Sequence, residues 1–138
     1  MGENEALVRR WFRDVWKAGG ETTVDELLAP NIEGFLEGGD IHTLAEFQES
    51  RRQLLDAFPD LDVEVEDVVE QGNRAVIRWR CRATHKGAGL GIPATFKPVA
   101  FRGMTWVEIQ NGQIVRGWDS WNQGALVQSL MGPSAGVL

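Results

Sequence analysis

The hydrophobic pattern of this chain changes at Pro59, and that change limits the possible folds more than any other feature. Before Pro59, apolar residues recur at spacings of three and four, which is typical of amphipathic helices. After Pro59, apolar and polar residues alternate, which is typical of strands with one buried face. Helices followed by strands predict an α+β domain built on a curved antiparallel sheet.

Three helices are expected before Pro59. Residues 4–18 form the first, and its apolar face consists of Leu7, Val8, Trp11, Phe12, Val15 and Trp16. The segment 23–26 has the spacing of a capping box and begins a short helix that ends before Pro30. The segment 43–46 repeats this signal and begins a helix that Pro59 closes.

Segments 61–70 and 74–85 alternate in polarity and predict a hairpin around Gly72. Three pairs of opposite charges then align on one face: Asp62 with Arg82, Glu64 with Arg80 and Glu66 with Arg78. The other face is expected to be core, and it carries Ala75, Ile77, Trp79, Cys81, Ala83 and His85. Asp67 falls on that core face, where it either acts as a desolvated acid or base or is turned outward by a bulge.

A second hairpin is predicted from residues 98–110 and 113–122, because Asn111-Gly112 is a strong two-residue turn signal. Pairing Gln110 with Gln113 assigns to the interior Phe101, Gly103, Thr105, Val107, Ile109, Ile114, Arg116, Trp118, Ser120 and Asn122. The opposite face carries Met104, Trp106, Glu108, Val115, Asp119 and Trp121. Since exposed Trp and Met patches usually mark contacts, we expect a homodimer through Met104, Trp106 and Trp121.

The totals describe one domain, over residues 1–138, with 43% apolar and 25% charged residues. The net charge of −6 argues against binding to nucleic acid or to an anionic membrane surface. Cys81 is the sole cysteine, so an intrachain disulfide is impossible. The N-terminus lacks the layout of a signal peptide and no run reaches the length of a membrane span, so a cytoplasmic location is expected.

Three motifs in the second half occur in a characteristic order. They are Thr84-His85-Lys86-Gly87, then Gly91-Ile92-Pro93-Ala94-Thr95, then Gly112-Gln113-Ile114 followed by Trp118. In this order they resemble the SnoaL-like polyketide cyclases, a family within the nuclear-transport-factor-2-like, or cystatin-like, superfamily. The resemblance extends over roughly residues 4–132. It implies a cone, in which the sheet curls around the N-terminal helices and its open end is a ligand pocket.

The resemblance also implies a reaction, an intramolecular aldol ring closure without a cofactor, in which an acidic side chain relays a proton. The family places that acid four residues after the tryptophan, where this chain has Asn122. An amide donates and accepts hydrogen bonds but does not change protonation near neutral pH. Two further hypotheses therefore stand beside a cyclase: a non-catalytic small-molecule-binding protein of the same fold, and a dimeric interaction module without a ligand.

Three residues are candidates for the reaction itself. His85 would carry the proton, or would hydrogen-bond and close the end of the sheet. Asn122 would orient or polarise the carbonyl. Asp119 is the nearest carboxylate that could replace the family acid, and a strand bulge would be needed to turn it inward.

The pocket walls are expected to include Trp16, Phe35, Trp79, Phe101, Thr105, Arg116 and Trp118, although the aromatic members could equally fill the core. An interior Arg116 would need a partner, either Glu33, Glu37 or Asp67, or an anionic ligand. His42 and His85 have no other ligands at metal-binding spacing, so no metal site is expected. The chain has no tyrosine, which excludes a direct transfer of the tyrosine-dependent mechanisms of related cone-fold enzymes such as ketosteroid isomerase.

Overall fold

The computed structural model describes residues 2–131, so the ends of the expected 1–138 domain, residue 1 and residues 132–138, lie outside the described part. The elements follow the order α1 (Glu3–Asp14), α2 (Glu21–Leu27), β1 (Leu28–Leu36), β2 (Gly39–Ile41), α3 (Leu44–Ala57), β3 (Asp62–Gln71), β4 (Arg74–Thr84), β5 (Pro98–Gln110), β6 (Gln113–Trp121) and α4 (Gln123–Leu130). No helix between residues 2 and 131 is both long and apolar enough to cross a membrane.

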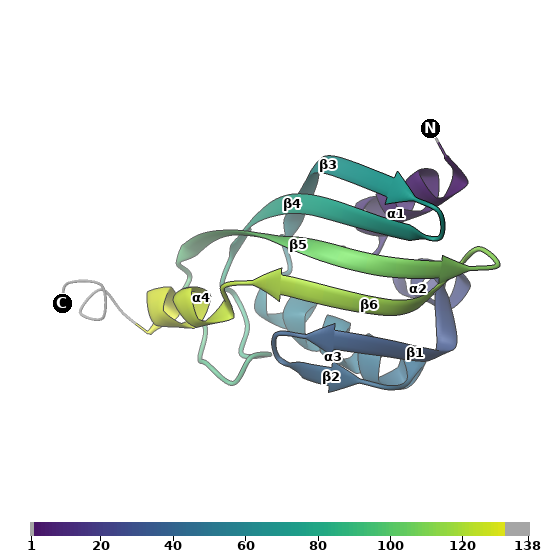
Figure 1. Cartoon of the computed structure of the whole chain (residues 1–138). Coiled ribbons are helices and arrows are strands. Elements are labelled where there is room, and N and C mark those ends of the chain that lie inside the picture. Colours follow the sequence, from purple (N-terminus) through teal and green to yellow (C-terminus); the bar gives the residue numbers. More distant parts are fainter. Residues whose placement is uncertain (1, 132–138) are drawn as a thin grey trace.

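One curved sheet of six strands, in the order β2-β1-β6-β5-β4-β3, covers helices α1, α2 and α3 on its inner face (Figure 1). The α+β fold class is therefore confirmed. The sheet is mixed and not wholly antiparallel, because β1 pairs with β6 in parallel. Strands β1 and β2 were not predicted. β1 pairs with β6, which is distant in the sequence, and β2 is a strand of only three residues that follows β1 after the turn at Glu37-Gly38.

The β3–β4 hairpin has the predicted charge pairs on its outer face. Glu64 lies 2.9 Å from Arg80, Glu66 lies 3.2 Å from Arg78, and Asp62 lies 3.8 Å from Arg82. The expected core face of β4 is buried from Ala75 to His85. A bulge between Val65 and Asp67 leaves Asp67 exposed, which is the outward alternative.

The β5–β6 hairpin turns at Asn111-Gly112, with positive φ angles of 51° and 76° that suit a type I′ turn. Gln110 pairs with Gln113 as expected, but a bulge follows between Glu108 and Ile109. Beyond the bulge, Glu108 pairs with Arg116, and the following residues of β6 face the side of the sheet opposite to the predicted one.

This reversal corrects the predicted facing of β6. Thr105 now pairs with Asp119, and Gly103 pairs with Trp121, so Asp119 and Trp121 share the inner face with Thr105. Arg116 and Trp118 lie on the outer face with Glu108 and Trp106. The inner face of β6 therefore contributes a carboxylate to the space between the sheet and the helices.

Candidate functional site

A cavity of about 110 Å³ lies between the inner face of the sheet and helices α1 and α3. Its walls are mainly aromatic and aliphatic side chains. Helix α1 and the segment after it contribute Trp11, Phe12 and Trp16, while the sheet contributes Trp79, Phe101 and Trp121. Thr105 and Asp119 are the only lining residues, among those described, that carry a side-chain oxygen. The cavity is thus an apolar chamber with one polar point.

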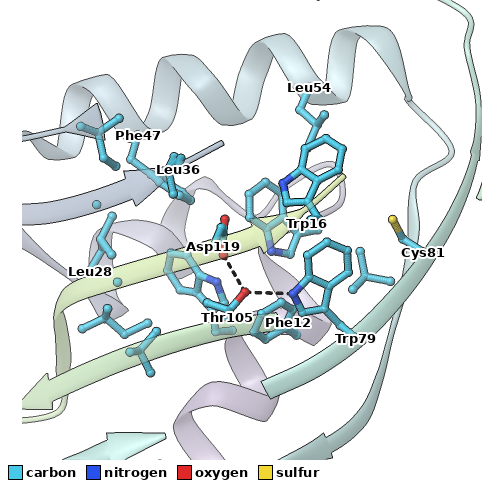
Figure 2. Close-up of a pocket in the computed structure, with 18 of the residues that line it drawn as sticks. Phe12, Trp16, Leu28, Leu36, Phe47, Leu54, Trp79, Cys81, Thr105 and Asp119 are labelled. Atoms are coloured by element: carbon cyan, nitrogen blue, oxygen red, sulfur yellow. Dashed lines mark hydrogen bonds between the residues drawn. The ribbon is translucent and has the colours of Figure 1, made fainter. Parts of the chain in front are cut away.

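A chain of hydrogen bonds crosses three strands to reach that point. The Trp79 indole N–H donates to Thr105 Oγ1 at 2.9 Å, and the Thr105 hydroxyl donates to Asp119 Oδ1 at 2.6 Å. Figure 2 shows the three side chains in this line, with Asp119 directed among the apolar walls. Gly103 makes the arrangement possible, because a Cβ there would lie 2.8 Å from the Trp79 ring and 2.6 Å from the Ser120 carbonyl oxygen. The hydroxyl fixes one carboxylate oxygen and leaves Oδ2 available to a ligand.

Burial raises the pKa of Asp119 from its ordinary value near 3.8 to about 6, and the negative charge of Glu37 adds to the rise. The hydrogen bond from Thr105 acts in the opposite direction, because it favours the charged carboxylate. Asp119 is half-buried as a residue because it faces the cavity, but protein surrounds it closely. The side chain can therefore take up and release a proton near neutral pH.

His85 lies outside the residues that line the cavity and is fully buried. The backbone N–H of Thr95 donates to His85 Nδ1 at 3.2 Å, and the Thr95 hydroxyl oxygen lies 3.0 Å from the same nitrogen, which leaves the other ring nitrogen, Nε2. That Nε2 has no hydrogen-bond partner within residues 2–131. The His85 backbone also bonds to Lys97 and Phe96, at 3.0 and 2.8 Å. These contacts match the closing role that was the alternative to proton transfer.

Asn122 is the N-cap residue of α4. Its Oδ1 accepts the backbone N–H of Ala125 at 2.8 Å, and the residue is exposed. It does not line the cavity. The predicted position beside a substrate carbonyl is therefore corrected, because β6 ends one residue earlier and Asn122 begins a helix.

Three expected pocket residues also lie elsewhere. Arg116 pairs on the outer face with Glu108 at 2.5 Å and with Glu33 at 3.1 Å, and Glu33 is one of the partners predicted for it. Trp118 stacks on Phe35, with ring centroids 5.4 Å apart, and neither lines the cavity. Four others do line it as expected, namely Trp16, Trp79, Phe101 and Thr105.

Trp121 is a cavity residue that the sequence analysis assigned to the dimer face. It stacks on Phe101 with ring centroids 4.9 Å apart. A signal for the correct facing was present, since the rule of opposite charges across strands that located the first hairpin would also pair Glu108 with Arg116. That pairing requires the bulge and brings Asp119 inward.

The remaining polar chemistry of the cavity is limited. Burial raises the pKa of the Cys81 thiol to about 12, so the sulfur is protonated and a poor nucleophile. Within residues 2–131 no three side chains of the His, Cys, Asp and Glu types gather in a group able to hold a metal ion.

Comparisons with known proteins agree on the fold. The family model of the SnoaL-like polyketide cyclases matches residues 6–130. A structure from Jannaschia Sp. CCS1, provisionally a SnoaL-like polyketide cyclase, has a TM-score of 0.88 at 22% identity, over 94% of this chain and 92% of that one. IdmH from Streptomyces antibioticus, provisionally a polyketide cyclase, has a TM-score of 0.79 at 22% identity, over 95% and 99%.

AclR from Streptomyces galilaeus, provisionally a hydroxylase, is 27% identical with a TM-score of 0.76, over 95% of this chain and 83% of that one. No curated protein matches the chain.

Proposed function

Because the chain belongs to the SnoaL-like polyketide cyclase family, we propose that it catalyses an aldol-type ring closure, without a cofactor, on a hydrophobic small molecule that bears carbonyl groups. Asp119 is the acid–base residue of this proposal, in place of His85 and Asn122. The observation that carries it is the Asp119 carboxylate, held by Thr105 inside an apolar cavity with its pKa raised to about 6.

The proposed reaction uses one proton in two steps. Asp119 Oδ2 removes a proton from a carbon next to a carbonyl group, and the resulting enolate carbon attacks a second carbonyl of the same molecule. A carbon–carbon bond forms, the attacked oxygen becomes an alkoxide, and Asp119 returns its proton to that oxygen. The walls favour the folded substrate that this attack requires, and such positioning can contribute several kcal/mol.

Two other functions remain as outcomes of the test. A non-catalytic binding protein was suggested by Asn122 at the family acid position, and Asp119 in the cavity weakens that reason. A dimeric interaction module without a ligand would need no cavity, and the cavity supports a ligand. We therefore favour catalysis.

The test uses heptane-2,6-dione, a small linear diketone, with proton exchange into D₂O and ring closure followed by NMR. We expect Asp119→Asn to lower both rates by about 10²–10⁴-fold. For the wild type, kcat/KM should rise with pH through about 6 and then level off, because the carboxylate must be ionised to act as a base.

Asp67→Asn is the matched control, since it makes the same change at an exposed bulge of β3 and should leave both rates unchanged. Equal rates for the wild type and Asp119→Asn would refute the assignment. The product mass separates reaction types: ring closure adds no atoms, whereas a gain of one oxygen would indicate the hydroxylase class given for AclR.

A further inference from the structure

A polar groove lies beside the apolar cavity, between α1 and the first half of β3. It encloses about 420 Å³. Phe12, Trp16, Leu61 and Val63 border both hollows. The two spaces are therefore neighbours across a thin apolar wall, and Trp16, which is half-buried, is the more exposed of its two aromatic members.

The cavity alone is small for a substrate that must fold and close a ring. Its volume of about 110 Å³ compares with the ~150 Å³ apolar cavity that holds one benzene-sized molecule. A ligand with a longer chain must extend beyond the cavity, and the groove is the adjoining space. The chemistry of the groove then specifies the outer end of the ligand.

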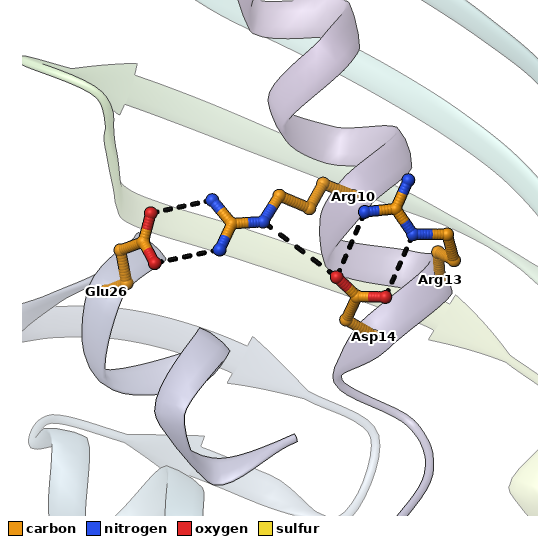
Figure 3. Close-up of polar contacts among 4 residues, drawn as sticks. All are labelled: Arg10, Arg13, Asp14 and Glu26. Carbon is orange, nitrogen blue, oxygen red and sulfur yellow. Dashed lines mark hydrogen bonds and ion pairs between the residues drawn. The ribbon is translucent and has the colours of Figure 1, made fainter. Parts of the chain in front are cut away.

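Cations line the helix side of this groove, and one of them lacks an ion pair. Arg13 binds Asp14 through two hydrogen bonds, of 2.9 and 3.1 Å, as Figure 3 shows. Arg9 binds Glu5 at 2.9 Å. Lys17 has no carboxylate within 4.0 Å of its ammonium group among residues 2–131.

The acidic residues on the strand side are already paired. Glu64 lies 2.9 Å from Arg80, and Asp62 lies 3.8 Å from Arg82. Among the described residues, these contacts leave Lys17 as the groove cation without a direct ion pair, although the whole chain carries a net charge of −6. The Lys17 charge also acts on the Asp14 carboxylate, but Arg10 and Arg13 already bind that carboxylate. A cation beside an apolar chamber suits a ligand with an anionic end and an apolar body.

We propose that the ligand of this protein is an amphiphilic acid, whose apolar reactive part occupies the cavity and whose anionic group lies in the groove at Lys17. Only the reactivity of the apolar part rests on the function proposed for Asp119. Trp16 is the side chain that such a ligand displaces when it spans both spaces.

Two fluorescent probes with one skeleton test this. They are 8-anilino-1-naphthalenesulfonate, which carries a sulfonate, and N-phenyl-1-naphthylamine, which does not. We expect the wild type at low salt and pH 7 to bind the sulfonate about tenfold more tightly, because a charge-assisted contact adds to the same apolar burial. Lys17→Met should reduce this ratio to about one and leave the affinity for the neutral probe unchanged.

Two controls locate the effect. Lys97→Met makes the same change of charge at a half-buried position of the loop before β5, remote from the groove lining, and should keep the tenfold ratio. Gly117→Leu should abolish binding of both probes, because a side chain there extends into the cavity and its Cβ meets only ordinary contacts, at 3.7 Å.

The proposal would be overturned if the wild type bound the two probes equally or bound neither of them. It would also be overturned if Lys17→Met kept the tenfold ratio, or if Gly117→Leu still bound the probes. Asp119→Asn should keep the tenfold ratio. If the wild type shows no turnover but keeps the tenfold affinity ratio between the two probes, the protein is a binding protein for amphiphilic acids. If the wild type is an active enzyme but binds the two probes equally, only the anion site at Lys17 is refuted.

Discussion

At the scale of single residues, the environment of Asp119 decides its chemistry. Water solvates an exposed aspartate and holds its pKa near 4. In the cavity the carboxylate has one hydroxyl donor, from Thr105, and is otherwise faced by apolar walls. The charged form is therefore less stable than in water, and this instability makes the group a useful base.

The raised pKa of Asp119 also predicts that the wild type and the Asp119→Asn variant differ in unfolding free energy in a way that depends on pH. The pKa of Asp119 is about 6 in the folded protein and near 3.8 when unfolded, so the folded state binds this proton more tightly. The stability that this bound proton contributes to the folded state is present in full below about pH 4. It declines as the pH rises to about 6 and does not change further above that pH. In the Asp119→Asn variant the side chain has no charge at any of these pH values, so its unfolding free energy should not show this decline.

We therefore expect Asp119→Asn to exceed the wild type in unfolding free energy by about 2–3 kcal/mol at pH 7.5, and to match it more closely at pH 4. Urea titrations at both pH values measure this difference. The Asn Oδ1 can still accept from Thr105, so the hydrogen bond is retained. A constant difference at both pH values would contradict the raised pKa.

At the scale of elements, a buried arginine joins helix α3 to the end of α1. Arg51 is 2% exposed. It donates to the carbonyl oxygens of Val15 and Lys17, both at 2.6 Å, and to Glu21 at 3.2 Å. These carbonyls follow the last turn of α1, where helices leave acceptors unsatisfied. The contacts fix the backbone of residues 15–17 beside the cavity and the groove.

Arg51→Met should lower the unfolding free energy by about 3 kcal/mol, because it leaves buried carbonyl groups without donors. The neighbouring Arg52 supplies a matched control, since it is exposed and its pair with Glu49 lies on the surface of α3. Arg52→Met should change the unfolding free energy by less than about 0.5 kcal/mol. Urea unfolding of both variants measures the contrast, and similar losses would show that burial of Arg51 does not matter.

At the scale of the whole molecule, apolar side chains cross the outer face of the sheet. Cα pairing connects Val69, Val76, Trp106, Trp118 and Phe35 in one row over five strands. Trp106 is 42% exposed and the adjacent Met104 is 53% exposed. Trp121 is no part of this face, because it lines the cavity.

The homodimer stays a prediction, now through Met104, Trp106 and Trp118. Sedimentation of the wild type at micromolar concentration should give twice the mass of one chain. Trp106→Lys should give a monomer, because two facing copies would bury like charges. Glu49→Lys on α3, away from the sheet, should remain dimeric. A strictly monomeric wild type would refute this interface.

Local patterns were sufficient to predict helices α1 and α3, both hairpins and the class of the fold. The second helix was also expected, but it begins at Glu21, so Thr23 lies inside α2 and is not its N-cap. The period of apolar residues placed α1 and α3, and the charge pairs of β3 and β4 determined which of their faces is buried. The Asn111-Gly112 turn located the second hairpin, because few residues other than Asn and Gly adopt positive φ at both positions. These features depend on residues near one another in the chain.

Tertiary structure decided what those patterns left open. The parallel pairing of β1 with β6 joins residues about 80 positions apart, as in Glu33 with Arg116, and no local signal marks it. The bulge at Glu108 decided which side of β6 faces the helices. Side chains alternate strictly along a strand, so one extra residue moves every later one to the other face. By that single step Asp119 and Trp121 enter the cavity, and Arg116 and Trp118 leave it.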